Sequence, residues 1–92
     1  MRIEITHAAQ GDLSAAFRFL AERSPNAGRR VRSAIRRAIL GLAQFPNRGR
    51  HGVVPDTREL LVPGAPYVLV YVVGEDALTV LRVRHVRQDP SP

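Results

Sequence analysis

The stretch at residues 78–85 ends in side chains that can carry out acid–base and phosphate chemistry. His85 offers an imidazole, a side chain used as a general acid or base, and Glu59 offers a carboxylate in an earlier stretch rich in β-formers. Metal-free cleavage of RNA needs a base near the 2′-OH, an acid at the leaving oxygen and cations on the phosphate. Arginine suits the last task, because its planar guanidinium can bind phosphate through two hydrogen bonds. The candidate catalytic residues of such a nuclease are His85, Glu59, Arg58, Arg82, Arg84 and Arg87.

His85 has a second interpretation, which is structural. It follows the alternation of Leu81 and Val83 along the chain. A histidine at that position can cap the edge of the core, with its ring hydrogen-bonded to the backbone. We favour this structural role over the catalytic one.

The metal-binding residue types do not form a site in the sequence. His7, His51 and His85 are spread along the chain without the spacing of ligands, and cysteine is absent. The lack of cysteine also excludes disulfides and thiolate ligands. We therefore predict neither a metal nor a cofactor.

The charge of the chain is strongly positive and unevenly placed. The chain contains fourteen arginines and eight acidic residues, which gives a formal net charge of +6. No acidic residue lies between Glu22 and Asp56. Such a block attracts an anionic partner, either nucleic acid or an acidic protein, although it also fits a solvated helix face. Aromatic residues make up only 5% of the chain, which disfavours modules that stack on bases.

The elements that position these residues begin with a short strand and two helices. Residues 2–6 alternate around Ile3 and Ile5, and helical spacing then extends to about Arg23. Ser24 and Pro25 have the types expected at an N-cap and at the first position of a second helix. The apolar face of that helix holds Ala27, Val31, Ala34, Ile35, Ala38, Leu42 and Phe45. The short connection predicts an antiparallel helical hairpin.

An irregular basic loop is predicted at residues 45–52, and three β-rich runs follow it. They occupy residues 57–62, 66–73 and 78–85 and are separated by clusters of Pro and Gly. This pattern indicates an antiparallel meander of three strands. The predicted fold is α+β: an N-terminal strand, then a helical hairpin packed on one face of a small sheet, in one domain over residues 1–92.

The middle run of the meander is apolar on both faces, and the hairpin can cover only one of them. In the final run, Leu81 and Val83 share one face by strict alternation. Leu78 and Val80 then share the opposite face with Arg82 and Arg84. We expect a partly apolar sheet surface, rimmed by arginine and available to a partner.

The N-terminal stretch lacks the apolar run of a signal peptide, and the run from Tyr67 to Val73 is far shorter than the roughly 20 residues of a membrane-spanning helix. We therefore expect a cytoplasmic protein.

Several segments, in this order, resemble the ParE/RelE toxin superfamily of bacterial toxin–antitoxin modules. The resemblance covers nearly the whole chain. Its motifs are Asp12-Leu13, Phe45-Pro46-x-x-Gly49-Arg50-x-Gly52, Thr57-Arg58-Glu59-Leu60, Pro66-Tyr67-Val68-Leu69-Val70-Tyr71 and Leu81-Arg82-Val83-x-His85.

The resemblance implies a toxin that stops growth by acting on DNA gyrase or on ribosome-bound mRNA, and that a cognate antitoxin neutralises. Both branches share one fold, so the fold does not separate them. The mRNA-cleaving branch commonly has an arginine where this chain has Val68. The loss of that cation favours the ParE-like, non-nucleolytic branch.

The leading hypothesis is therefore a gyrase inhibitor that acts by binding. A ribosome-dependent mRNA endonuclease is the alternative, and a non-toxic basic nucleic-acid-binding module is the third hypothesis. The expected partner is an antitoxin with an acidic and apolar C-terminal segment that folds on binding. The residues predicted to bind the antitoxin, in a hetero-oligomer, are Val68, Val70, Arg82, Arg84, Arg29, Arg32 and Arg36.

Overall fold

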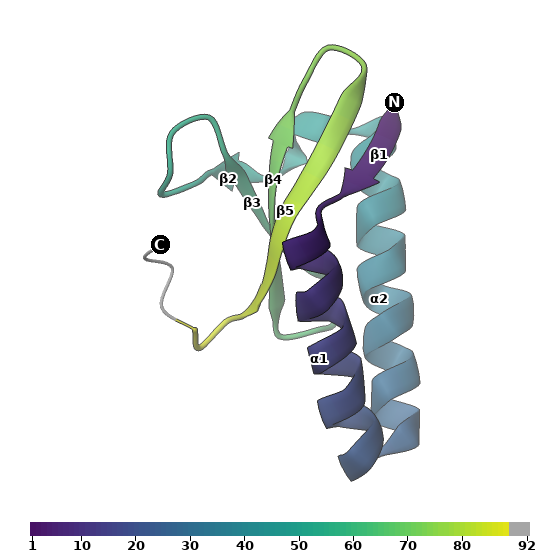
Figure 1. Cartoon of the computed structure of the whole chain (residues 1–92). Helices are drawn as coiled ribbons and strands as arrows, with labels where there is room; N and C mark the ends of the chain where they lie inside the picture. The colour runs from purple at the N-terminus through teal and green to yellow at the C-terminus, as the bar shows by residue number, and fades with distance from the viewer. Residues whose placement is uncertain (89–92) are drawn as a thin grey trace.

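Two antiparallel helices cover one face of a five-stranded mixed sheet in the computed structural model, which describes residues 1–88 (Figure 1). The strand order is β1-β5-β4-β3-β2, with β1 parallel to β5 and the other neighbours antiparallel. This arrangement confirms the predicted α+β fold and the meander. The elements are β1 (Arg2–Ile5), α1 (His7–Arg23), α2 (Pro25–Gln44), the 3₁₀ helix η1 (Pro46–Arg48), β2 (Arg50–His51), β3 (Arg58–Leu61), β4 (Tyr67–Val73) and β5 (Ala77–His85).

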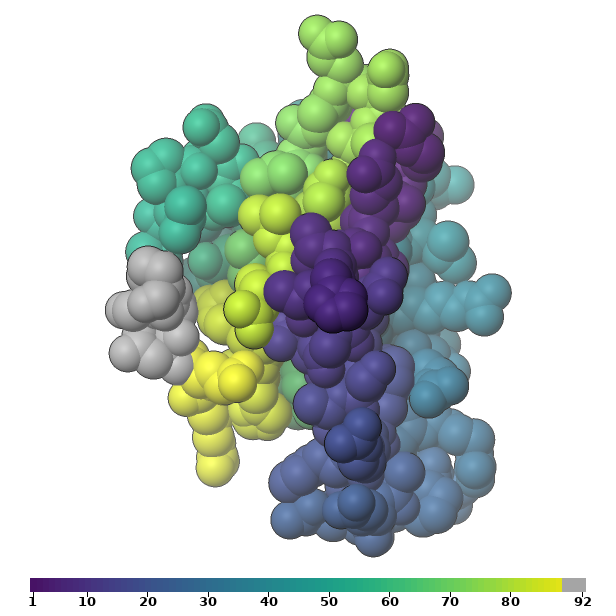
Figure 2. All heavy atoms as spheres, in the orientation of Figure 1, coloured from purple at the N-terminus to yellow at the C-terminus, as the bar shows by residue number. Residues whose placement is uncertain are grey.

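The two helices meet at a single serine. The Ser24 hydroxyl caps α2 by accepting from the amide of Ala27 at 3.3 Å, while its own amide donates to the Leu20 carbonyl that ends α1. Pro25 occupies the first turn of α2, where it costs no hydrogen bond. The predicted cap is confirmed. Figures 1 and 2 show the end of the hairpin projecting past the sheet.

The core lies between the hairpin and the sheet. The helix α2 contributes Ala34, Ile35, Ala38 and Leu42, all buried, and small alanines let the helix approach the strands closely. The prediction that Phe45 belongs to this apolar face is wrong. The helix ends at Gln44, and Phe45 as its C-cap leaves helical geometry and is 65% exposed.

The connection after α2 is more regular than the sequence predicted. The segment 45–52 contains η1 and the two-residue strand β2. The buried Tyr71 hydroxyl holds it to β4, accepting from the amide of Gly49 at 2.8 Å and donating to the carbonyl of Pro46 at 2.7 Å. A Cβ on Gly49 would come within 2.6 Å of that hydroxyl oxygen, so this approach requires glycine.

An irregularity in β5 reverses its alternation. Opposite β4, Val70 pairs with Arg82 and the next residue, Tyr71, pairs with Val80, so Leu81 is an extra residue in β5. Leu78, Val80 and Val83 all consequently point into the core. The predicted grouping of Leu78 and Val80 with Arg82 and Arg84 is wrong for this reason, because the bulge separates the two pairs onto opposite faces.

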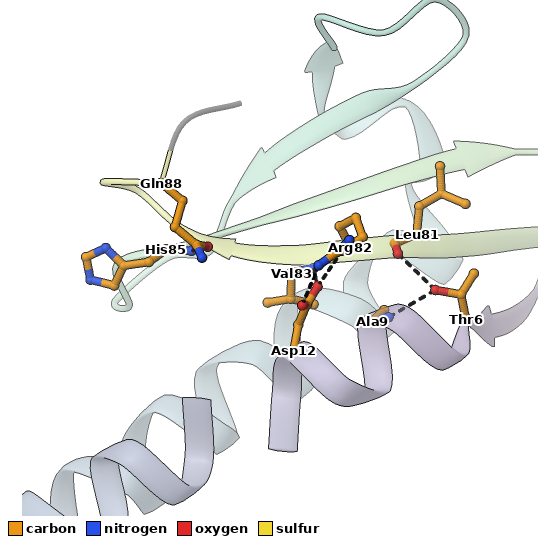
Figure 3. A network of polar contacts seen from close by, with 8 residues as sticks. All are labelled: Thr6, Ala9, Asp12, Leu81, Arg82, Val83, His85 and Gln88. Carbon is orange, nitrogen blue, oxygen red and sulfur yellow. Dashed lines mark hydrogen bonds and ion pairs between the residues drawn. The ribbon is translucent and has the colours of Figure 1, made fainter. Parts of the chain in front are cut away.

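The helix α1 begins just after β1 ends. Beyond the end of β1, side chains at the start of α1 replace it as hydrogen-bonding partners of the β5 backbone (Figure 3). The Thr6 hydroxyl accepts from the amide of Ala9, capping α1, and donates to the carbonyl of Leu81 at 2.8 Å. One turn later Asp12 accepts from the amide of Val83 at 2.9 Å. Two backbone groups of an otherwise unpaired edge are thereby satisfied.

Neither of the helices described over residues 1–88 combines the length and the apolar character needed to cross a membrane.

Candidate functional site

The face of the sheet that the helices leave uncovered carries five of the predicted site residues, and we call it the open face. One row across the strands joins Arg50, Glu59, Val70 and Arg82. A second row joins Leu61, Val68 and Arg84. The alternate residues of β4 point into the core on the other side.

Arg84 and Glu59 form an ion pair across β4. The guanidinium of Arg84 on β5 lies 3.0 Å from a carboxylate oxygen of Glu59 on β3. The strand β4 lies between β5 and β3, so the Arg84 side chain must cross it, next to its register partner Val68. Val68 is only 7% exposed although it is on the open face.

Glu59 is itself a buried carboxylate with several donors. Its side chain is 5% exposed, and the guanidinium of Arg50 lies 3.3 Å from the same oxygen that Arg84 contacts. The amide of Val53 donates to its other oxygen at 3.4 Å. Burial alone would raise the pKa of Glu59, but these hydrogen bonds and the charge of Arg84 lower it below the ordinary value. A carboxylate held in its ionised form in this way is a weak base.

A groove of about 410 Å³ opens beside this ion pair, and we call it the open-face groove. Apolar side chains of Leu61, Val68 and Val86 line part of it. Its charged lining consists of three arginines and one carboxylate: Arg48, Arg50, Arg84 and Glu59.

Arg82 turns away from this groove and toward α1. Its guanidinium binds the Asp12 carboxylate through two hydrogen bonds of 2.8 and 2.9 Å (Figure 3). Burial opposes the ionisation of Asp12, but the hydrogen bonds from Arg82 and from the amide of Val83 outweigh it and lower the pKa of Asp12. The two arginines of β5 thus reach in different directions, each to its own carboxylate.

His85 lies at the end of β5 with its ring against the edge of the core. Its ring makes an edge-on contact with Tyr67, with centroids 5.3 Å apart, and its Nδ1 accepts from the amide of Arg87 at 3.1 Å. Gln88 accepts from the backbone amide of His85. Figure 3 shows the ring pointing away from Arg82. These contacts are those of the structural interpretation favoured from the sequence.

The remaining nuclease candidates are also separated. One nitrogen of the Arg58 guanidinium donates to the backbone carbonyls of Asn47 at 3.3 Å and Gly49 at 2.8 Å, so it fastens η1 to β3. Arg87 lies exposed in the turn after β5. The structure therefore engages all of these candidates except Arg87 within the chain: Glu59 and Arg84 pair with each other, while His85, Arg58 and Arg82 each have other partners. Within residues 1–88, no cluster of three potential metal ligands is present.

The residues predicted to bind an antitoxin fall on two surfaces. Val68, Val70 and Arg84 are on the open face, whereas Arg29, Arg32 and Arg36 belong to α2 in the helical layer. Arg32 and Arg36 flank a groove of about 230 Å³ between the two helices and β1, which we call the hairpin groove. Its apolar lining is Ile5, Leu13, Phe17, Ile35, Ile39 and Leu40.

Two features of the site were missed in the sequence analysis. The first is the pairing of Glu59 with Arg84, for which a signal exists: Glu59 is the only acidic residue between Asp56 and Glu75, and it lies in a β-rich run. The second is the role of Asp12 at the edge of β5. Asp12 flanks the apolar side of the first helix, between Ala9 and Ala16, but its partner is 70 residues away, so periodicity does not identify the pairing.

The model of a protein family, described as the ParE toxin of the type II toxin–antitoxin system parDE, matches residues 3–90 of this sequence. The chain belongs to the ParE toxin family. This family membership makes it a toxin of a type II toxin–antitoxin module, whose partner is an antitoxin.

Individual relatives agree with this membership. The chain is 34% identical over 70 residues to a putative toxin, Y4kP, of Sinorhizobium fredii, covering 76% of this chain and 72% of that protein. It is 32% identical over 80 residues to toxin RelE2 of Caulobacter vibrioides, covering 87% and 89% of the two chains. A chain of the chromosomal ParDE system from P. aeruginosa has the same fold, with a TM-score of 0.83 at 24% identity over 92% of this chain and 95% of that one.

Proposed function

We propose that this ParE-family toxin inhibits DNA gyrase by binding to it, without chemistry of its own. The observation that carries the proposal is the separate engagement of the candidate catalytic groups. Glu59 is ion-paired, His85 accepts a backbone hydrogen bond, and Arg82 is bound by Asp12. An RNA-cleaving site instead needs a base, an acid and cations that converge on one phosphate.

The residue at position 68 supports the same conclusion. Val68 is nearly buried under the path of Arg84, at the place where the resembling nucleases carry an arginine. Arg84 could replace that cation only by leaving Glu59, whose carboxylate would then remain buried without its principal partner. Breaking such a pair typically costs about 3–5 kcal/mol.

We further propose that the cognate antitoxin covers the open face and reaches α2. An apolar segment would lie on Val68 and Val70, near Arg82 and Arg84. Acidic residues of the same partner would be attracted to Arg29, Arg32 and Arg36, which are all exposed on α2. The absence of acidic residues between Glu22 and Asp56 supports this attraction.

A paired assay on purified toxin tests the gyrase proposal. We expect the protein to block supercoiling by gyrase and to leave ribosome-bound mRNA intact. We expect His85→Gln to keep the inhibition, because the glutamine amide can replace the acceptor that His85 Nδ1 offers to the backbone.

The alternative, a ribosome-dependent mRNA endonuclease, predicts the opposite result in both assays. Cleavage of ribosome-bound mRNA by the wild type, lost in His85→Gln while supercoiling is unaffected by either protein, would establish the nuclease instead. Thermal unfolding of both proteins, followed by circular dichroism, serves as the control that the variant is folded.

A further inference from the structure

The open-face groove contains a charge arrangement that the proposed function does not require. Arg48, Arg50 and Arg84 line it, a set that by itself would attract a phosphodiester chain. The same groove also contains Glu59, whose side chain is only 5% exposed and contacts two of these three arginines. The question is which anion this groove can accept.

Glu59 already binds Arg84, which makes the shorter of its two arginine contacts in the groove. The side chain of Arg84 is 17% exposed, and it is committed to Glu59 at 3.0 Å. Arg50, whose side chain is 77% exposed, keeps only a 3.3 Å contact with the same oxygen and can turn outward. The buried Nε of Arg84 has no partner, but a phosphate entering the groove would meet a guanidinium already bound to Glu59 through its Nη2 and a fixed negative charge within a few ångströms. A like charge at that distance weakens the attraction that the three arginines would otherwise exert on a second anion.

We propose that Glu59 is the specificity-determining residue of the open-face groove, and that its carboxylate excludes nucleic-acid phosphates from it. The carboxylate acts as an internal anion, which neutralises Arg84 and leaves the apolar surface of Leu61, Val68 and Val86 for a protein partner. This inference deepens the proposed function, because it names the residue that makes the face unsuited to RNA. RNA binding is measured without gyrase or antitoxin, so either idea can fail alone.

The first test compares two variants that remove one negative charge each. Glu59→Gln keeps one oxygen, which can accept from Arg84 or from Val53, because these donors reach different oxygens of Glu59. Glu4→Gln removes an exposed carboxylate on β1, at the opposite edge of the sheet. Binding of a labelled single-stranded RNA of about 10 nucleotides is measured by fluorescence anisotropy at several salt concentrations. We expect Glu59→Gln to bind about tenfold more tightly than Glu4→Gln. Its slope of log K against log salt should steepen by about 0.7 for each phosphate gained.

Equal affinity and equal slope for these two variants would overturn the proposal. A second comparison uses side chains whose removal does not threaten the fold. Arg50→Gln and Arg2→Gln each remove an exposed arginine that pairs with a glutamate, in the groove and at the far edge respectively. We expect the same small loss of RNA affinity in both. A clearly larger loss in Arg50→Gln would show that the groove already binds RNA in the wild type, and the proposal would be wrong.

Discussion

At the scale of single residues, the ionisable side chains of this toxin serve its own structure. The carboxylate of Asp12 is 18% exposed and that of Glu59 is 5% exposed, and each binds an arginine of β5 and a backbone amide. Both carboxylates accept a hydrogen bond from a backbone amide as well as from an arginine. They therefore hold strands and loops in place in addition to neutralising the arginine charge. Of these two carboxylates only Glu59 is a nuclease candidate, and its engagement by Arg84 supports inhibition by binding.

The lowered pKa of Asp12 makes the stability of the protein depend on pH. Asp12 has a lower pKa in the folded state than in the unfolded state, so its contribution is fully present above the unfolded value of about 3.9 and is lost as pH falls through the folded value. We expect Asp12→Asn to be less stable than the wild type at pH 7, by about 1–3 kcal/mol. Urea unfolding at a series of pH values measures the difference.

The difference between the two proteins should shrink as the pH is lowered below about 4, because the wild type then loses the same charge. Stability curves that stay parallel down to pH about 2 would contradict a role for the ionised carboxylate. Glu59, whose pKa is also lowered, should add to the acid sensitivity of both proteins equally.

At the scale of elements, the bulge in β5 determines which residues face a partner. The extra residue Leu81 keeps Val80 and Val83 in the core and turns Arg82 and Arg84 to the open face. If the same residues alternated strictly, Val80 and Val83 would lie on opposite faces, and one of them would leave the core. The site therefore depends on a single inserted position.

Deletions at two neighbouring positions test the bulge. Removal of Leu81 restores regular alternation while keeping every other β4–β5 pair, so we expect the protein to fold, with a loss of about 1 kcal/mol for the hydrogen bond from Thr6. Removal of Thr79 instead puts Leu78 and Val80 on opposite faces, and we expect it to prevent folding. Circular dichroism and thermal unfolding of both variants give the answer. Equal tolerance of the two deletions would contradict this account of β5.

The elements also show what a sequence can predict. Helical spacing, the Ser24-Pro25 cap and the Pro-Gly turns correctly located both helices and the three strands of the meander. Those signals are local, and each lies within a few residues. The bulge at Leu81 and the edge contacts of Asp12 arise only when distant strands are paired, and nothing in the neighbouring residues marks them. The candidate residues were therefore identified by type, while their partners were not.

At the scale of the whole molecule, the two surfaces predicted to bind the antitoxin lie on different layers. The open face belongs to the sheet and the arginines of α2 to the helical layer, in a molecule with extents of 39, 27 and 22 Å. A partner that contacts both layers must pass around an edge of the sheet. An extended segment of about 12 residues spans the longest of these dimensions, at roughly 3.3 Å per residue. A flexible segment that folds on binding meets this demand better than a rigid domain.

The positive block on α2 should act mainly on the rate of association. We expect the rate constant for antitoxin binding to fall as salt rises. The triple variant R29Q/R32Q/R36Q should slow association more than it speeds dissociation. The control R2Q/R18Q/R87Q removes the same charge from exposed positions elsewhere. Stopped-flow or surface-plasmon measurements with the purified antitoxin give both rates. A rate that does not respond to salt would rule out electrostatic steering by α2.

The pairing of β1 with β5 has a consequence for synthesis on the ribosome. Arg2–Ile5 pair with residues 77–80, and the Thr6 hydroxyl bonds to a carbonyl 75 residues later. The helical hairpin is local and can form early, but the first strand has no neighbour until Ala77–Val80 have left the exit tunnel. Strand β1 must therefore wait, without its neighbour in the sheet, until β5 has been made. Arg82 and Arg84 lie beyond residues 77–80, so a growing toxin also has no finished open face to present while that part of its messenger is still being read.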